Sequence, residues 1–328
     1  MKSIERHCDS TTRAAIATAV MVTAMLLACM SRSLAEEHGA VAEYMTAAYL
    51  DCYEAKKTSA ILPTGQKLAF FDLGPRDGQP VVLIHGYTDS SRDWTPLTPQ
   101  LLSMFRLIVV DLRGHGASSK PECCYTRFDF AYDIKLLLDD LRIERADIVG
   151  HSLGSLVAQA FAQLWPDATR HLILISSTGT NFGTADGGLA WLQPLAQLRD
   201  PIDPNSTFMR EWWHESMRIN PEHFVSRQRR DAAAIPAAIW RAIADQSIVG
   251  VDLAFMLPRI RAPTLLIWGE KDLLATADGR AALSSGIAGS QTRIFSSLGH
   301  DLFWENPQAV GAVMREFLLG KSAVTTPR

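Results

Sequence analysis

The chain of 328 residues has no run of basic residues, no internal repeat and no low-complexity tract. Its net charge is −3, so its composition does not favour a nucleic-acid partner. No group of Cys and His residues has the spacing of a zinc site, and we therefore expect no metal. We expect no other cofactor either. The composition that is present, 47% hydrophobic and 20% charged, suits one large or two closely packed domains with a substantial core.

The first 35 residues differ in kind from the rest. Three basic residues precede an apolar run from Ala14 to Cys29, which is shorter than the about 20 residues of a membrane span. Small residues follow at 33–35, an order that predicts a secretory signal peptide cleaved after about Ala35. Alternatively, the residues ending at Cys29 resemble a lipobox, which would leave Cys29 lipid-modified. Both interpretations predict a mature protein that works outside the cytoplasm, as a periplasmic, secreted or lipid-anchored protein.

Cleavage after residue 35 would remove four basic and two acidic residues and leave a net charge of −5. Three cysteines would remain, Cys52, Cys123 and Cys124. In an oxidising compartment one disulfide is expected, with Cys52 bonded to one of the two adjacent cysteines. Because the number is odd, at least one cysteine stays free or pairs in another way.

The central motif of the chain is Gly150-His-Ser-Leu-Gly154, which follows a short apolar strand and precedes a helix-forming run over 155–165. In this strand–turn–helix context a G-x-S-x-G element holds its Ser on a strained turn, with the hydroxyl exposed at the end of the sheet. Glycines are needed on both sides because side chains there would collide with the neighbouring strand and helix. The motif predicts that Ser152 is a nucleophile.

Strands alternate with helices around this motif. Patterns of buried or hairpin strands occupy 59–62, 67–72, 80–84, 107–111, 147–151, 171–175, 264–268 and 291–295. Helical patterns occupy 36–57, 94–104, 128–141 and 303–319. This alternation predicts an α/β fold built on a mostly parallel, doubly wound sheet.

The alternation stops after the sixth strand. Residues 178 to about 258 contain no convincing buried strand, and their helical pattern is rich in aromatic residues and broken by prolines. An all-helical insertion of this kind predicts a cap over the carboxyl end of the sheet, where such sheets bind ligands. The expected domains are a signal peptide at 1–35, a helical extension at 36–58, a core at 59–178 and 259–320, a cap at 179–258 and a disordered tail at 321–328.

A Ser nucleophile needs a base and a carboxylate that orients the base. Asp272 follows the strand at 264–268 and His300 follows the strand at 291–295, so both are expected at the edge of the sheet that carries Ser152. We predict Asp272 as the acid, with Glu270 as a weaker alternative, and His300 as the base. The other histidines near the motifs are expected to pack or to form local hydrogen bonds; these are His85, His115 and His151.

The oxyanion of an acyl-transfer reaction needs two backbone donors. The N–H of Leu153, directly after the nucleophile, is the first predicted donor. The second is the N–H of Tyr87, in the turn after the strand at 80–84.

Five short motifs carry a resemblance to a known family: His85-Gly86, Asp111-Leu-Arg-Gly-His-Gly-Ala-Ser118, the Ser152 motif, Gly269-Glu-Lys-Asp272 and Gly299-His300. Together they resemble the capped α/β-hydrolase superfamily over about residues 60–320. The resemblance implies an α/β-hydrolase fold in which Ser, acid and His follow in the order seen here. Relatives that open epoxides or remove halide carry Asp where Ser152 stands, so those two reactions are not expected.

A Ser nucleophile favours acyl transfer. We predict an exported, metal-free serine hydrolase that cleaves carboxylic esters of an apolar or aromatic small molecule. Trp191, Trp212 and Phe182 are the predicted substrate contacts, and packing between cap and core is their alternative role. A lactonase, a carbon–carbon bond hydrolase and a non-catalytic ligand-binding module remain alternatives.

Overall fold

The computed structural model describes residues 47–179, 182, 190–213, 222–249 and 252–320. The predicted signal peptide, the alternative lipobox at Cys29, residues 36–46 of the N-terminal extension and the tail at 321–328 lie outside these residues. Among the helices that are described, none is long and apolar enough to cross a bilayer.

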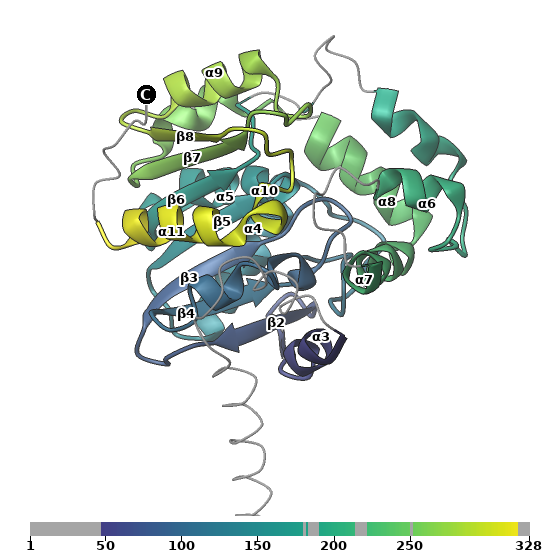
Figure 1. Ribbon diagram of the computed structural model, residues 1–328. Helices are drawn as coiled ribbons and strands as arrows, with labels where there is room; N and C mark the ends of the chain where they lie inside the picture. Colours follow the sequence, from purple (N-terminus) through teal and green to yellow (C-terminus); the bar gives the residue numbers. More distant parts are fainter. Residues whose placement is uncertain (1–46, 180–181, 183–189, 214–221, 250–251, 321–328) are drawn as a thin grey trace, which may run out of the picture.

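One eight-stranded sheet forms the centre of the molecule, in the strand order β1-β2-β4-β3-β5-β6-β7-β8 (Figure 1). Strands β1 and β2 form an antiparallel hairpin, β2 is also antiparallel to β4, and every other pair in the sheet is parallel. The expected mostly parallel, doubly wound sheet is therefore confirmed. The strands are β1 (Thr58–Ile61), β2 (Lys67–Leu73), β3 (Gln79–Ile84), β4 (Phe105–Val110), β5 (Ala146–His151), β6 (Thr169–Ile175), β7 (Thr264–Gly269) and β8 (Gln291–Phe295).

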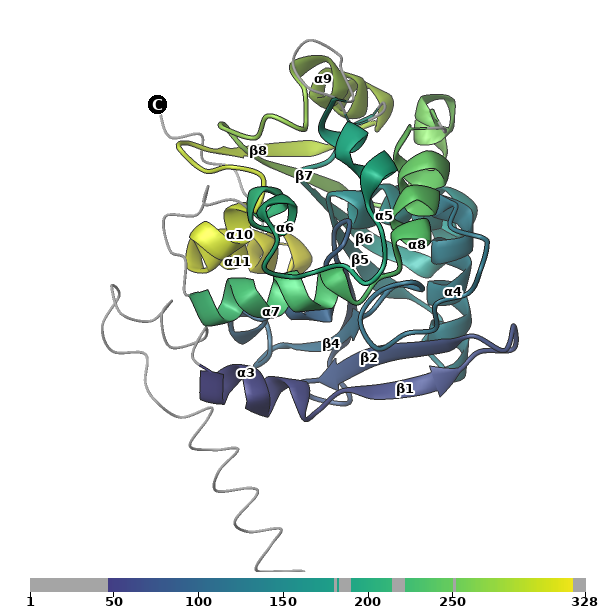
Figure 2. The same cartoon turned by 90° about the vertical axis from the view of Figure 1, so that its right-hand side faces the viewer.

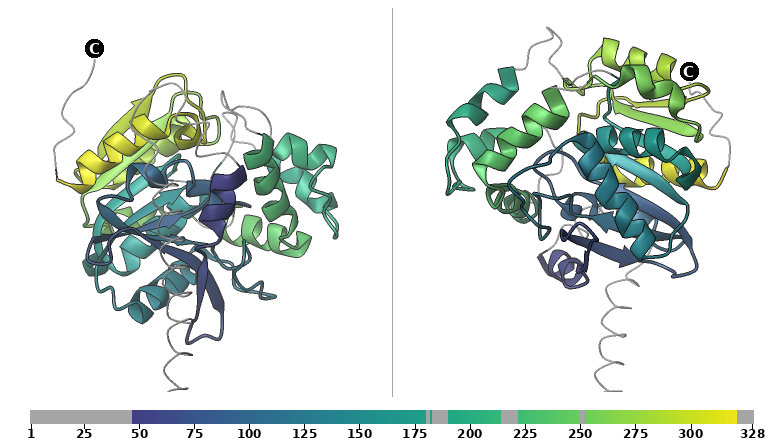
Figure 3. Two further views of the ribbon diagram at one scale, coloured as in Figure 1. Left: turned by 60° about the horizontal axis from the view of Figure 1, so that its bottom comes forward. Right: turned by 180° about the vertical axis from the view of Figure 1, so that it is seen from behind.

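The parallel strands from β3 to β7 are largely apolar on both faces, because each face packs on its own core. In β3, Val82 and Ile84 belong to one hydrophobic cluster, and the alternating Val81 and Leu83 belong to the other. This period of two follows from the pleat of a strand, and it explains why these segments are continuous apolar runs. Helix α5 packs on β5 and β6 and against α4, while α11 lies on the opposite side of the sheet (Figures 1 and 3).

The helices differ in type as well as in place. The α-helices are α3 (Ala47–Glu54), α4 (Arg127–Asp140), α5 (Leu153–Leu164), α6 (Thr207–Trp212), α7 (Glu222–Ala233), α8 (Ala237–Ile243), α9 (Ala277–Gly286), α10 (Leu302–Glu305) and α11 (Pro307–Leu318). The 3₁₀-helices are η1 (Ser91–Trp94), η2 (Thr98–Gln100), η3 (Pro166–Ala168), η4 (Ala190–Gln197) and η6 (Ala254–Arg259), and η5 (Ala244–Val249) is a π-helix.

The predicted helix over 94–104 is wrong. The segment forms only η1 and η2, joined by turns. Pro96 and Pro99 lie in this segment, and each removes a backbone N–H donor and clashes with the preceding helical turn. The predicted helix over 303–319 is likewise divided at Pro307, where the Asn306 side chain accepts the N–H of Ala309 and starts a second helix.

The helical insertion between β6 and β7 lies beside the carboxyl ends of the strands (Figure 2). Side chains of the core and of the inserted helices form hydrogen bonds and an ion pair between the two parts. The Tyr87 hydroxyl donates to the carbonyl of Trp240 at 2.7 Å, and Arg92 pairs with Asp231 at 2.9 Å. The Arg127 Nε donates to the carbonyl of Ser247 at 2.6 Å. Cap and core therefore share buried polar contacts as well as apolar ones.

Helix α3 packs on the core and on the inserted helices rather than standing apart. Tyr53 is buried against the ring of Phe71, with the ring centroids 4.4 Å apart. Lys57, just after the helix, pairs with the fully buried Asp111 at 3.1 Å. Arg227 of α7 reaches Asp51 of α3 at 2.7 Å. The described part of the N-terminal extension thus supplies a counter-ion to the core and a contact to α7.

The expected disulfide of Cys52 is wrong. Cys123 and Cys124 are bonded to each other, so no sulfur of this pair is left for Cys52, which is a free, half-buried thiol.

We expect a substitution at Gly154, in the turn region after β5, to destabilise the fold. A Cβ at Gly154 would overlap the backbone carbonyls of Ile84 and His85 at the end of β3. We expect Gly154→Ala to lower the free energy of unfolding by about 1–3 kcal/mol, because strand and helix must move apart. Urea unfolding would measure this. Leu164→Ala, at the exposed end of the same helix, should cost less, and equal losses in the two variants would contradict the argument.

Candidate active site

Ser152 lies on a strained turn between β5 and α5. Its backbone has φ 51° and ψ −121°, outside the regions that non-glycine residues prefer. The Ser152 N–H donates to the carbonyl of Ile175 at 3.0 Å, and the Ser155 hydroxyl donates to the Ser152 carbonyl at 2.6 Å. Gly150 allows the turn to close, because a Cβ there would overlap the Gly154 carbonyl. The surrounding hydrogen bonds hold the strained residue in place.

His300 and Asp272 come from the turns after β8 and β7 and meet as a hydrogen-bonded pair. The His300 Nδ1–H donates to Asp272 Oδ1 at 2.9 Å. The same carboxylate oxygen accepts the backbone N–H groups of Leu274 at 2.9 Å and Ala275 at 3.2 Å. A carboxylate held in this way fixes both the tautomer and the orientation of the imidazole.

Opposing effects set the charges of this pair. Burial disfavours the imidazolium, but the charge and hydrogen bond of Asp272, with smaller effects of Asp301 and Asp93, raise the pKa of His300 to about 8. Burial likewise disfavours the Asp272 carboxylate, but the charge and hydrogen bond of His300 and two backbone N–H groups lower its pKa below the usual range. Asp272 is therefore ionised at neutral pH, and His300 can exchange a proton near neutral pH.

Ser152 and His300 both line one cavity of about 510 Å³, in the size range of small-molecule sites. The cavity lies between the end of the sheet and the inserted helices. Its wall is rich in aromatic residues, which are Tyr87, Phe182, Phe208, Trp212, Trp213 and Trp304. Such a wall suits an apolar ligand, with the Ser hydroxyl and the imidazole as its polar groups.

All but one of the predicted oxyanion donors and substrate contacts line this cavity. Leu153 and Tyr87, the predicted oxyanion donors, both line the cavity. So do Phe182, whose ring lies edge-on to His300 with the centroids 6.2 Å apart, and Trp212, whose Nε1–H donates to Thr88 Oγ1 at 2.9 Å. Trp191 belongs to η4, but its side chain lies outside the described part of the structure.

Glu270, the alternative acid, points elsewhere, since its Oε2 accepts the N–H of Ser297 at 3.3 Å. His85 and His115 are fully buried and play the local roles expected of them. His85 Nε2 accepts the N–H of Leu112 at 3.0 Å, and burial lowers the pKa values of both rings, that of His115 to about 3. These two histidines stay neutral.

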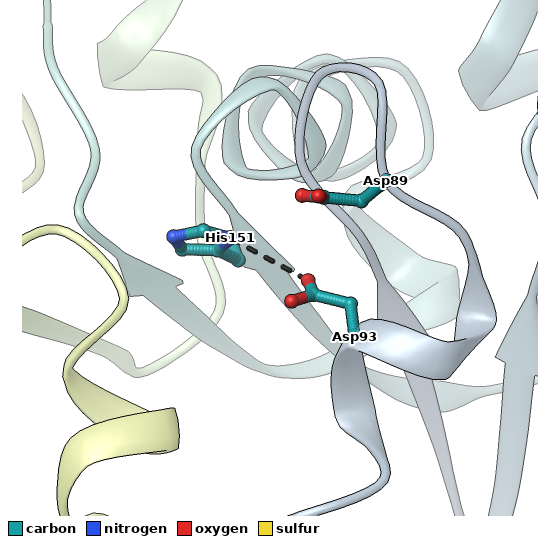
Figure 4. Close-up of side chains that lie close together, drawn as sticks. All are labelled: Asp89, Asp93 and His151. Atoms are coloured by element: carbon teal, nitrogen blue, oxygen red, sulfur yellow. Dashed lines mark ion pairs between the residues drawn. The ribbon is translucent and has the colours of Figure 1, made fainter. Parts of the chain in front are cut away.

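The sequence did not predict that acidic side chains gather around His151. Asp89, Asp93 and His151 each place a donor atom within 4.8 Å of the others (Figure 4), and such a set could hold a metal ion. Burial and the charges of Asp93 and Asp301 raise the pKa of Asp89 well above its usual value, and Asp301 is shifted in the same direction by burial. No spacing signal marks this cluster, because strand order brings distant segments together.

Comparison with known proteins gives a consistent result. A family model described as alpha/beta hydrolase fold matches residues 79–307. The uncharacterized protein Rv2715 of Mycobacterium tuberculosis is 29% identical over 273 residues, 77% of this chain and 79% of that protein.

Two further relatives have named activities. The 2-hydroxy-6-oxononadienedioate/2-hydroxy-6-oxononatrienedioate hydrolase of Escherichia coli K12 is 26% identical over 299 residues, 84% of this chain and 96% of that protein. The crystal structure of esterase RhEst1 from Rhodococcus sp. ECU1013 has a TM-score of 0.70 and 22% identity, over 81% of this chain and 100% of that one. This last likeness shows the fold.

The His300–Asp272 pair predicts a measurable titration. In wild type the imidazole pKa of His300, followed by NMR and assigned with His300→Gln, should be about 8. Asp272→Asn should lower this pKa, because burial then acts against the imidazolium without the opposing carboxylate. Glu270→Gln should leave it unchanged. A His300 pKa that does not move in Asp272→Asn would show that the pair is not coupled.

Proposed function

The chain belongs to the alpha/beta hydrolase fold family, and from this premise we propose that it is a serine hydrolase of carboxylic esters. The observation that carries the proposal is the hydrogen-bonded His300–Asp272 pair, which opens into the same cavity as the strained Ser152. A nucleophile, a base and an orienting carboxylate are the three groups that such catalysis requires.

In the proposed reaction, Ser152 Oγ attacks the ester carbonyl while His300 Nε2 accepts its proton. His300 then gives this proton to the leaving alcohol, and Asp272 stabilises the imidazolium between the two transfers. The backbone N–H groups of Leu153 and Tyr87 bind the oxyanion. A water molecule, activated by the same imidazole, then attacks the acyl-enzyme, releases the acid and restores Ser152.

The lining of the cavity supports a substrate that is uncharged and largely apolar. Besides the aromatic wall, Ile248, Leu273 and Leu274 contribute aliphatic surface. The acidic residues of the described lining are Asp89, Asp301 and Glu211, and Lys271 is its one Lys or Arg side chain. Burying apolar groups of the substrate against this wall would supply most of the binding free energy.

Carbon–carbon bond hydrolysis is the second candidate. The Escherichia coli hydrolase named for 2-hydroxy-6-oxononadienedioate and 2-hydroxy-6-oxononatrienedioate aligns with this chain over 96% of its own length. Its name describes dioates, which carry two carboxylates. The described lining of this cavity offers Lys271 as its one Lys or Arg partner for two carboxylates. Burying a carboxylate without a partner is costly, so we favour neutral esters, including lactones.

The ester proposal predicts turnover of p-nitrophenyl esters with a dependence on acyl chain length that reflects the cavity of about 510 Å³. Ser152→Ala should lower kcat by about 10⁴-fold or more, because the acyl-enzyme cannot form. Since His300 must be unprotonated to act as the base, kcat/KM of wild type should rise with pH through about 8.

The same assay separates the candidates. A panel of p-nitrophenyl esters, small lactones and 2-hydroxy-6-oxo-dioates should show the esters as the best substrates. Turnover of the dioate alone would replace the ester proposal by the carbon–carbon reaction. Equal ester turnover by wild type and Ser152→Ala would refute the assigned nucleophile.

We also propose that the enzyme is exported. The support is in the sequence, where three basic residues, the apolar run from Ala14 to Cys29 and small residues at 33–35 precede the acidic Glu36. In a bacterial host that exports it, the mature protein should have an intact mass that begins at Glu36. A protein whose mass corresponds to a chain that starts at a lipid-modified Cys29, and that is no longer formed in the Cys29→Ser variant, would establish the lipoprotein instead. An unprocessed cytoplasmic protein would contradict export.

A further inference from the structure

We propose that Asp89, Asp93 and His151 bind one divalent transition-metal cation at the base of the cavity. Asp89 lies in the loop after β3, Asp93 in η1 and His151 at the end of β5, and their side chains converge (Figure 4). Their donor atoms all lie within 4.8 Å of one another. This site is independent of the proposed ester chemistry, and its test measures binding rather than turnover.

The first argument is that buried donor atoms in this cluster have no hydrogen bond. Among the described residues, neither carboxylate oxygen of Asp93 has a hydrogen-bond partner, and His151 Nδ1 has none either. Asp93 is 0% exposed and His151 is 1% exposed. A buried carboxylate without partners is costly, so a compensating cation or proton is required here.

The second argument concerns the tautomer of His151. Its Nε2 lies 3.2 Å from the backbone carbonyl oxygen of His300 and 3.6 Å from Asp301 Oδ1, and a carbonyl oxygen can only accept. The proton of a neutral ring therefore lies on Nε2, and the lone pair of Nδ1 points toward Asp93 Oδ2, 3.5 Å away. Metal-binding histidines show this arrangement, with the second nitrogen donating to a carbonyl or carboxylate.

The third argument is the local charge. In the part of the chain that the structure describes, neither Asp89 nor Asp93 forms an ion pair with Lys or Arg, and the only ion pair of Asp93 is the long contact to His151. The carboxylates of Asp93, Asp301 and Asp231 act on Asp89 as like charges. A divalent cation would neutralise the two carboxylates that have donor atoms in the cluster.

The donor set indicates the kind of cation. Two carboxylates and one imidazole suit Zn²⁺ or Mn²⁺, and three protein ligands leave positions for water. Ligand atoms about 2.0–2.2 Å from a tetrahedral metal lie about 3.3–3.6 Å apart. His151 Nδ1 and Asp93 Oδ2 are already 3.5 Å apart, and the remaining donor pairs, which lie within 4.8 Å, need to close by at most about 1.5 Å. Asp89 and His151 line the cavity, which provides a path for entry.

Gly86 contributes the space beside these donors. A Cβ at this position would overlap Asp89 Oδ2 and would lie 3.1 Å from His151 Nδ1. The glycine therefore lets one carboxylate and the imidazole approach the same point from the loop and the strand.

The experiment is calorimetric titration of ZnCl₂ into the full mature chain after treatment with EDTA and dialysis, at pH 7.5 and without an affinity tag. The expected result is one Zn²⁺ per chain with a Kd below about 10 μM and a rise in Tm on saturation. Asp89→Asn and Asp93→Asn should each weaken binding by at least about 10–100-fold and reduce the rise in Tm.

His171→Gln is the matched control, because His171 also pairs with a buried Asp, at 2.8 Å from Asp147, but lies outside the cluster. It should bind Zn²⁺ as wild type does. If Asp93→Asn does not fold, Asp89→Asn at the cavity surface keeps the test valid. Absence of binding to wild type would overturn the proposal and leave a retained proton as the compensation. Unchanged binding in the Asn variants would overturn it as well, since the ion would then lie elsewhere.

Discussion

The close approach of the Ser152 turn to the end of β3 is the constraint on which the rest of the site depends. The backbone at Gly154 lies so near the carbonyls of Ile84 and His85 that no side chain fits between them. This contact fixes the start of α5 against the sheet and forces Ser152 into its strained conformation. It also brings the loop after β3, which carries Tyr87, beside Ser152, since a Cβ at Gly86 would lie 3.3 Å from Ser152 Cβ.

Buried charge is the second organising feature. Asp111 is paired with Lys57, Asp133 receives two hydrogen bonds from Arg113, and Asp272 pairs with His300. Each of these carboxylates has a partner whose positive charge offsets the cost of burial. Asp93 is equally buried, but among the described residues it has no Lys or Arg partner, and its contact with His151 is long. This missing counter-charge is the reason for proposing a cation there.

The sequence was sufficient for the parts of the fold that depend on local pattern. The strands from β3 to β7 can be predicted from their apolar runs, because both of their faces are buried. The G-x-S-x-G pattern predicts the strand–turn–helix element, because the turn requires both glycines. The pattern failed at 94–104, where two prolines prevent a helix, and at Cys52, whose expected partners bond to each other. The cluster could not be predicted, because Asp89 and Asp93, which follow β3, meet His151 only through the pairing of β3 with β5.

The most direct test of the central claim is covalent labelling of the nucleophile. Wild-type protein treated with a fluorophosphonate should gain one phosphonyl group by intact-mass measurement, and peptide mapping should place this group on Ser152. The His300→Ala variant should be labelled much more slowly, because it lacks the base that activates the Ser152 hydroxyl. An adduct on another residue, or no adduct in folded wild type, would contradict the account.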